Sequence, residues 1–135
     1  GGNSGSQATS LIIRAVALGE VRLADWWRVL YRELGAGLAL GAVLAGLAFV
    51  RIFFWPWGAS DYGEHYRLIA LAVAASLLGV VIYGTTIGAM LPLALRKLGF
   101  DPAVSSAPLI ATLVDVSGIV IYFSVAALIL RGTLL

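Results

Sequence analysis

The chain has 135 residues, of which 61% are hydrophobic and 12% are charged, and its formal net charge is +2. Ordinary soluble domains contain about a quarter charged residues, and a globule of this length lacks the interior volume to bury so much apolar surface. The absence of cysteine excludes disulfide bonds, thiolate metal sites and cysteine catalysis. With a mean hydropathy of +0.98, the sequence predicts an all-α integral membrane protein, a helical bundle whose outside is solvated by lipid.

The first segment, residues 1–19, is too short to cross a bilayer and is rich in glycine at its start. We expect irregular backbone over Gly1–Ser6 and a helix over Ala8–Leu18. Irregular backbone at membrane depth is tolerated only where protein or a water-filled cavity covers it. We therefore expect the chain to begin partway through a transmembrane segment.

Three longer apolar stretches follow, and each predicts a full transmembrane helix. A helix needs about 20 apolar residues to cross a hydrocarbon core of about 30 Å, and the stretches 34–57, 68–95 and 102–131 supply them. Aromatic residues typical of the membrane interface flank the first two stretches. They are Trp26, Trp27, Tyr31, Trp55, Trp57, Tyr62 and Tyr66.

The connections predict where helices end and which side of the membrane they face. Gly99 suits the position after a helix C-terminus, and Asp101-Pro102 supplies an N-cap and a first-turn proline for the last helix. Pro92 should kink the helix that contains it. Lys and Arg concentrate in residues 20–33 and 96–101, which predicts that both segments are cytoplasmic.

Small residues spaced four apart recur in the first two spans. Such pairs let helix backbones approach closely where lipid provides no hydrophobic drive for association. We expect most of them to be packing positions. The pairs are Gly37 and Gly41, Ala42 and Gly46, and Gly84 and Gly88.

Asp115 is the strongest candidate for a functional residue, because it is a charged residue near the middle of the last span. A carboxylate at that depth costs about 2.5–3.5 kcal/mol on insertion scales. No Lys, Arg or His in the interior of the three spans neutralises it. We expect it to face water and cations. A protonated carboxyl group, hydrogen-bonded to Ser or Thr of a neighbouring helix, is the alternative.

Helical spacing predicts that small residues share the face of Asp115 and that bulky ones cover the opposite face. A stripe of small side chains leaves room beside the carboxylate for a hydrated ion. Mg²⁺ usually keeps several of its waters and needs one or two carboxylates. Ca²⁺ requires more direct oxygen ligands than this depth offers. The small residues are Ala107, Pro108, Ala111 and Gly118, and the bulky ones are Leu113, Ile119, Val120 and Phe123.

In combination, several motifs resemble the transmembrane region of the MgtE family of magnesium channels, and the likeness covers essentially the whole chain in order. The motifs are Gly2-Asn3-Ser4-Gly5-Ser6-Gln7, Leu11-Ile-Ile-Arg14-Ala-Val-Ala-Leu18, Leu91-Pro92, Gly99-Phe-Asp-Pro-Ala103, Pro108-Leu-Ile-Ala-Thr112 and Asp115-Val-Ser-Gly118. The resemblance implies a five-helix domain of the plasma membrane that acts as a homodimer with its pore on the two-fold axis. Residues 1–19 would end the pore-lining second helix, and the family's cytosolic regulatory domains are absent from this fragment.

On this resemblance Asp115 would hold a hydrated Mg²⁺, with Ala111 contributing mainly a backbone oxygen; Mn²⁺ or Co²⁺ are further candidate ions. Relatives often have Asn at the positions of Ser6 and Ala107, so fewer side chains would hydrogen-bond to the hydrated ion here. The implied pore-lining residues are Asn3, Ser6, Gln7, Ala107, Pro108, Thr112 and Gly118.

Two other functions stay open on sequence grounds. In a secondary transporter, Asp115 would bind H⁺ or Na⁺ and exchange it for the divalent ion; the third possibility is a purely structural membrane subunit. The sequence contains no phosphate-binding loop, catalytic dyad or haem ligand pair, so we expect no enzyme, and nothing in it predicts a nucleic-acid partner. His65, in a polar loop, is expected to be solvated rather than a metal ligand.

Overall fold

The computed structural model describes residues 1–55, 62–101, 104 and 106–132, and it is built from helices. They are α1 (Gly2–Ala17), the short 3₁₀ turn η1 (Leu23–Asp25), α2 (Trp26–Phe53), α4 (Tyr66–Lys97) and α5 (Ala107–Leu130). No strand occurs in these ranges. The predicted fold class, an all-α membrane bundle, is confirmed, because α2, α4 and α5 are each long and apolar enough to cross a bilayer.

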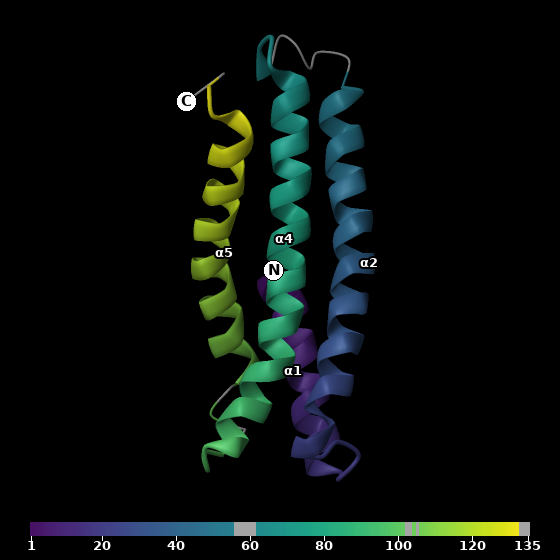
Figure 1. The fold of residues 1–135 in the computed structure, drawn as a ribbon, viewed down its shortest axis with the longest axis vertical. Coiled ribbons are helices and arrows are strands. Elements are labelled where there is room, and N and C mark those ends of the chain that lie inside the picture. The colour runs from purple at the N-terminus through teal and green to yellow at the C-terminus, as the bar shows by residue number, and fades with distance from the viewer. Residues whose placement is uncertain (56–61, 102–103, 105, 133–135) are drawn as a thin grey trace.

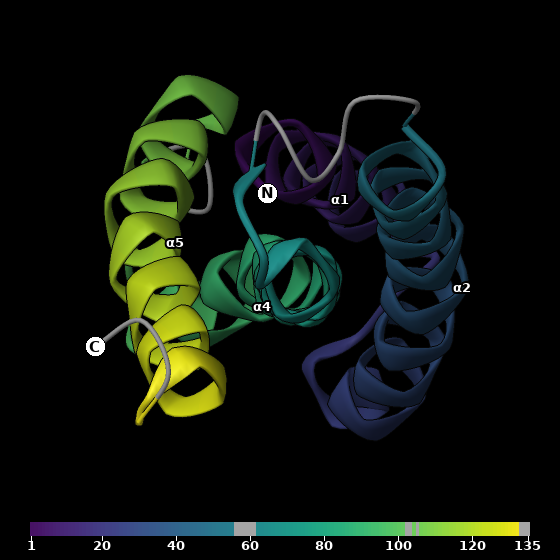
Figure 2. The ribbon, with the colours of Figure 1, turned by 90° about the horizontal axis from the view of Figure 1, so that it is seen from above.

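The helix α4 is the centre of the bundle. Seen from above, it lies between α2 and α5, and α1 packs beside it (Figure 2). The first residues lie at mid-height of the bundle, and α1 runs from there to the end where η1 and the last turn of α4 lie (Figure 1). Residues 2–17 therefore lie along one half of the bundle.

The three long helices exceed the thickness of a bilayer core. With 28, 32 and 24 residues, and a rise of 1.5 Å per residue, α2, α4 and α5 are about 42, 48 and 36 Å long. Large apolar side chains point outward along them, for example Leu47, Val120 and Leu128. Lipid rather than water is the solvent that suits this surface.

Glycines bring α2 and α4 into close contact. A Cβ atom built on Gly37 would lie 3.1 Å from the Cα of Ile82, and one on Gly41 would lie 2.8 Å from Leu78. The expected packing role is confirmed for these two glycines. It is wrong for Gly46, which has no neighbour within 4 Å of such an atom and faces outward.

The contact between α1 and α4 is closer still, because it joins backbone to backbone. A Cβ atom on Gly84 would lie 2.6 Å from the carbonyl oxygen of Gly1, and one on Gly88 would overlap the backbone of Gly5. The buried hydroxyl of Thr9 donates to the carbonyl of Gly88 over 2.7 Å. Residues larger than glycine would force the two helices apart.

Two predicted helix starts differ from the structure. Gly2–Ser6 is helical rather than irregular, because contact with α4 orders this turn and its backbone bonds are made, as in the 2.9 Å bond from Gly5 N–H to the Gly1 carbonyl. The helix α5 begins at Ala107, later than Asp101-Pro102, with Ser106 as its N-cap and a proline in its first turn. Two of the predicted span ends, Trp57 and Pro102, lie outside the described residues.

The predicted end of α4 is confirmed. Gly99 has φ +85, the left-handed conformation that glycine adopts readily after a helix. Its N–H donates to the Arg96 carbonyl over 3.1 Å, and the N–H of Phe100 donates to the Leu95 carbonyl over 2.9 Å. Pro92 lies inside α4, and the last, green turns of this helix lean away from the direction of its first turns (Figure 1).

The packing of α1 against α4 can be tested by comparing alanine substitutions at a packed glycine and at an exposed glycine. Gly88→Ala should destabilise the protein by about 1–3 kcal/mol, the usual cost of overpacking, because the new methyl group overlaps the backbone of α1. Gly46→Ala adds the same methyl group in open space and should be neutral or stabilise its helix by up to about 1 kcal/mol. Thermal unfolding of both variants in detergent measures the difference. Equal melting temperatures for the two variants would contradict the α1–α4 packing.

Candidate functional site

The carboxylate of Asp115 lies at the junction of α5 with the first turn of α1. The backbone N–H of Gly2 donates a hydrogen bond of 3.0 Å to its Oδ1. The donor is a main-chain amide, which can hydrogen-bond to a carboxylate, and not the Ser or Thr hydroxyl of the alternative considered above. The rest of the Asp115 side chain is exposed on the surface of the chain.

The packing of α5 determines where Asp115 points. Ile110 and Val114 are fully buried and face α1, where a Cβ on Gly5 would lie 3.3 Å from each. Since successive helix residues are rotated by about 100°, Asp115 falls at the edge of this buried face. It is therefore close enough to α1 to accept a hydrogen bond and still open on its other side.

A polar stripe runs along the exposed side of α1. Asn3, Gln7, Ser10 and Arg14 are not buried, and their spacing puts them on one face of the helix. Polar groups of this kind are costly against hydrocarbon, so the stripe suits water or another protein chain. Two residues of the stripe, Ser10 and Arg14, were not predicted to share this face with Asn3 and Gln7, although their helical spacing could have revealed it.

Three further predicted pore-lining residues, all on α5, divide into two groups. Pro108 and Thr112 are exposed, and the Thr112 hydroxyl donates to the carbonyl of Pro108 over 3.0 Å. By contrast, Gly118 is buried, and a Cβ there would lie 3.2 Å from Val80 of α4. The face of α5 that carries Gly118 is therefore covered within the chain.

The other predicted site residues are partly buried. Ala107, Ala111 and Ser6 are half-buried. The hydroxyl of Ser6 donates back to the carbonyl of Gly2, in its own helix. Within the described ranges, no three His, Asp or Glu side chains gather as a metal-binding cluster.

A cavity of about 450 Å³ opens beside Asp115 between α4 and α5. Its walls are apolar apart from Asp115 and a tyrosine. They show that the predicted position of two bulky residues of α5 is wrong. Ile119 and Phe123 line the cavity together with Asp115, because a residue four positions on shares the face of a helix. They do not lie on the face opposite Asp115. The lining residues are Leu77, Val80, Val114, Asp115, Gly118, Ile119, Tyr122 and Phe123.

Comparison with known proteins matches nearly all of this chain to one family. The family model described as "MgtE: Divalent cation transporter" matches residues 1–125. A "Magnesium transporter MgtE" of Thermus thermophilus is 45% identical over 132 residues, covering 98% of this chain and 27% of that protein. The protein of the same name in Bacillus subtilis is 34% identical, and the match covers 93% of this chain and 26% of that protein. The one in Enterococcus faecalis is 28% identical, and the match covers 96% of this chain and 27% of that protein.

The chain thus spans about a quarter of the length of these relatives. The helix α1, the long apolar helices α2 and α4, and the carboxylate of Asp115 all lie within the matched region, which ends inside α5. The chain belongs to the MgtE family of divalent cation transporters.

Proposed function

We propose that this chain forms the membrane part of a magnesium channel, in which Asp115 holds a hydrated Mg²⁺ as it crosses the bilayer. Three relatives carry the name magnesium transporter. The observation that carries the proposal is the exposed Asp115 carboxylate, which accepts a hydrogen bond from the Gly2 amide and lies two turns inside a helix long enough to span the membrane. A charge at such a depth is costly unless it faces water or ions.

A hydrated ion suits the chemistry around Asp115. The pair of Asn3 and Gln7 on α1 offers amide groups that can hydrogen-bond to waters of an ion's outer shell. Mg²⁺ loses its waters reluctantly and is commonly bound through one or two carboxylates. An outer-shell contact attracts the ion without holding it tightly, which lets it leave again. Mn²⁺ and Co²⁺ would be carried by the same arrangement.

We infer that two copies of the chain enclose the pore. The polar stripe of α1 and the carboxylate of Asp115 are both exposed on the surface of the chain, and the helices that carry them, α1 and α5, pack against each other. A two-fold axis along this surface would bring two stripes and two carboxylates together and exclude lipid from both. The metal-site residues would then be Asp115, with its charge, and Ala111, with its backbone oxygen one turn earlier. Pro108 and Thr112 would line the pore beside them.

The complete protein would lie in the plasma membrane, with its cytosolic regulatory region on the side of η1. The Lys and Arg residues of 20–33 and 96–101 support this orientation. Both segments lie at the same end of the bundle (Figure 1), which is also the end toward which the polar stripe of α1 leads.

Charge at residue 115 is the first quantity to test. Asp115→Asn keeps the size of the side chain but removes the charge that offsets entry of a cation into a low-dielectric region. Mg²⁺ uptake by proteoliposomes of the complete protein should fall close to background, while Asp115→Glu, which keeps the charge but is longer, should retain part of it. A protonated, structural carboxyl group predicts the reverse order, and normal uptake by the Asn variant would end the claim. Uptake that requires a counter-gradient of H⁺ or Na⁺ would favour exchange over a channel.

The position of the carboxylate gives a second prediction. A Cβ on Gly2 would lie 2.5 Å from Oδ1 of Asp115, so Gly2→Ala should displace the carboxylate and lower Mg²⁺ uptake. Gly79→Ala is the matched control, because its Cβ would be 3.8 Å from the nearest atom, in Ile121. Uptake by both variants is compared after equal amounts of folded protein are reconstituted. Undiminished uptake by Gly2→Ala would show that the contact with Gly2 does not position the ion site.

The dimer axis gives a third prediction. Thr112 and Val120 are both exposed, but only Thr112 lies on the Asp115 side of α5. Cysteine at Thr112 should form a disulfide between protomers under mild oxidation, and cysteine at Val120 should not. The two products are distinguished on a non-reducing gel. Cross-linking at Val120 alone would place the axis on the wrong face of α5.

A further inference from the structure

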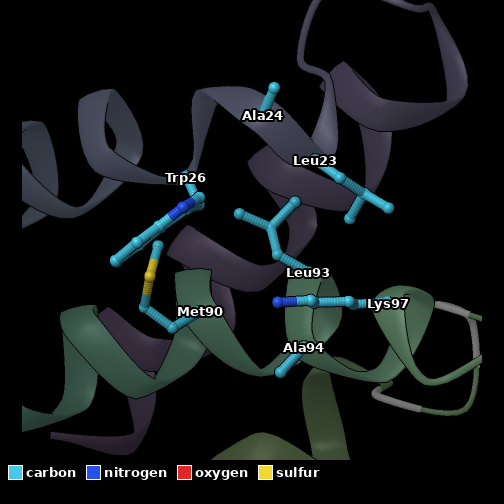
Figure 3. Close-up of a pocket in the computed structure, with 7 residues that line it drawn as sticks. All are labelled: Leu23, Ala24, Trp26, Met90, Leu93, Ala94 and Lys97. Carbon is cyan, nitrogen blue, oxygen red and sulfur yellow. The ribbon is translucent and has the colours of Figure 1, made fainter.

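A second cavity lies at the end of the bundle, away from Asp115. It has a volume of about 560 Å³ and is formed by η1, the first residue of α2 and the last turns of α4. Figure 3 shows the seven residues that line it. Six of them are apolar and one, Lys97, is charged; the full lining is Leu23, Ala24, Trp26, Met90, Leu93, Ala94 and Lys97.

The side chain of Lys97 extends along the cavity rather than away from the protein. Side chains of an α-helix lean toward its N-terminus, which for Lys97 means back toward the membrane. Figure 3 shows its ammonium group beneath Leu93 and turned toward Met90. The positive charge therefore lies beside the apolar wall that Leu93 and Met90 form.

The cavity also lies at the depth where lipid headgroups are expected. Trp26 forms one wall, and its ring stacks on Trp27 with centroids 4.1 Å apart. Tryptophans gather at the level of the headgroups in membrane proteins. The cavity is well within the size range of pockets that hold small ligands.

We propose that this cavity binds an anionic phospholipid, with its phosphate at Lys97 and one acyl chain along Trp26, Met90 and Leu93. The apolar lining matches an acyl chain, and the one cation among the lining residues, Lys97, matches a phosphate. A free phosphate ion would leave the apolar walls uncovered, and a zwitterionic lipid would gain less from Lys97. The proposal is independent of the ion pathway, because none of these residues lies beside Asp115.

A lysine in the last turn of α4 also complements the negative end of the helix dipole. Arg96 occupies the same turn with the same charge but is not part of the lining. It therefore provides a matched control, since both residues serve the helix end and only Lys97 reaches the cavity.

The test uses the complete protein in nanodiscs that contain phosphatidylglycerol with a photoreactive acyl chain. Irradiation followed by peptide mass spectrometry measures labelling of Trp26, Met90 and Leu93. Lys97→Gln should lower this labelling about fivefold, the factor expected from one basic contact with an anionic headgroup, and Lys97→Arg should restore it. Arg96→Gln should leave it unchanged. Ala94→Phe, which fills the cavity, should lower labelling by phosphatidylglycerol whatever residue stands at 97.

Three results would overturn the proposal. Equal labelling by phosphatidylcholine would show ordinary annular lipid, and equal losses in Lys97→Gln and Arg96→Gln would show a general effect of charge at the helix end. Labelling of none of the three residues, with all variants folded by size-exclusion chromatography, would show that another segment of the complete protein fills the cavity.

Discussion

Backbone contact between α1 and α4 is the interaction on which the arrangement of this chain depends. Gly84 and Gly88 present no side chains to α1, so the carbonyl groups of its first turns lie directly against α4. In lipid, association of helices relies on such close packing, because hydrocarbon solvates apolar side chains as well as protein does. The contact brings the amide of Gly2 to the carboxylate of Asp115. The geometry of the candidate ion site thus depends on glycines of a helix that does not itself carry the carboxylate.

The distribution of side chains over the bundle follows from the same need for close packing. Small residues occupy many of the contacts with the central helix α4, so that bulky aliphatic side chains are left to face the lipid. The polar exposed side of α1 is the exception to this apolar surface. Because a polar face is unfavourable against hydrocarbon, it distinguishes the side of the molecule suited to water or a second protomer from the sides suited to lipid.

Two charges, at different depths, are placed by helix geometry in different surroundings. Asp115 lies within a span and is exposed beside a polar helix face, the position from which we propose that it attracts a hydrated cation. Lys97 lies at a helix end, beside an apolar cavity, where its charge matches the headgroup of a lipid. The electrostatic energy of each charge depends on what solvates it, so similar-looking isolated charges in one hydrophobic sequence can serve unrelated purposes.

Much of this organisation was predictable from the sequence, because it is encoded locally. Hydropathy and length predicted the three spans, the glycine after α4 predicted its terminus, and a lone carboxylate within an apolar run marked Asp115 as the candidate site. Tertiary packing decided the rest: that Gly2–Ser6 is helical, that Gly46 faces outward, that Gly118 is covered, and that the amide of Gly2 meets Asp115. The physical reason is that helical periodicity operates over a few residues, whereas the contact between residues 2 and 115 spans almost the whole chain and depends on how three helices pack together.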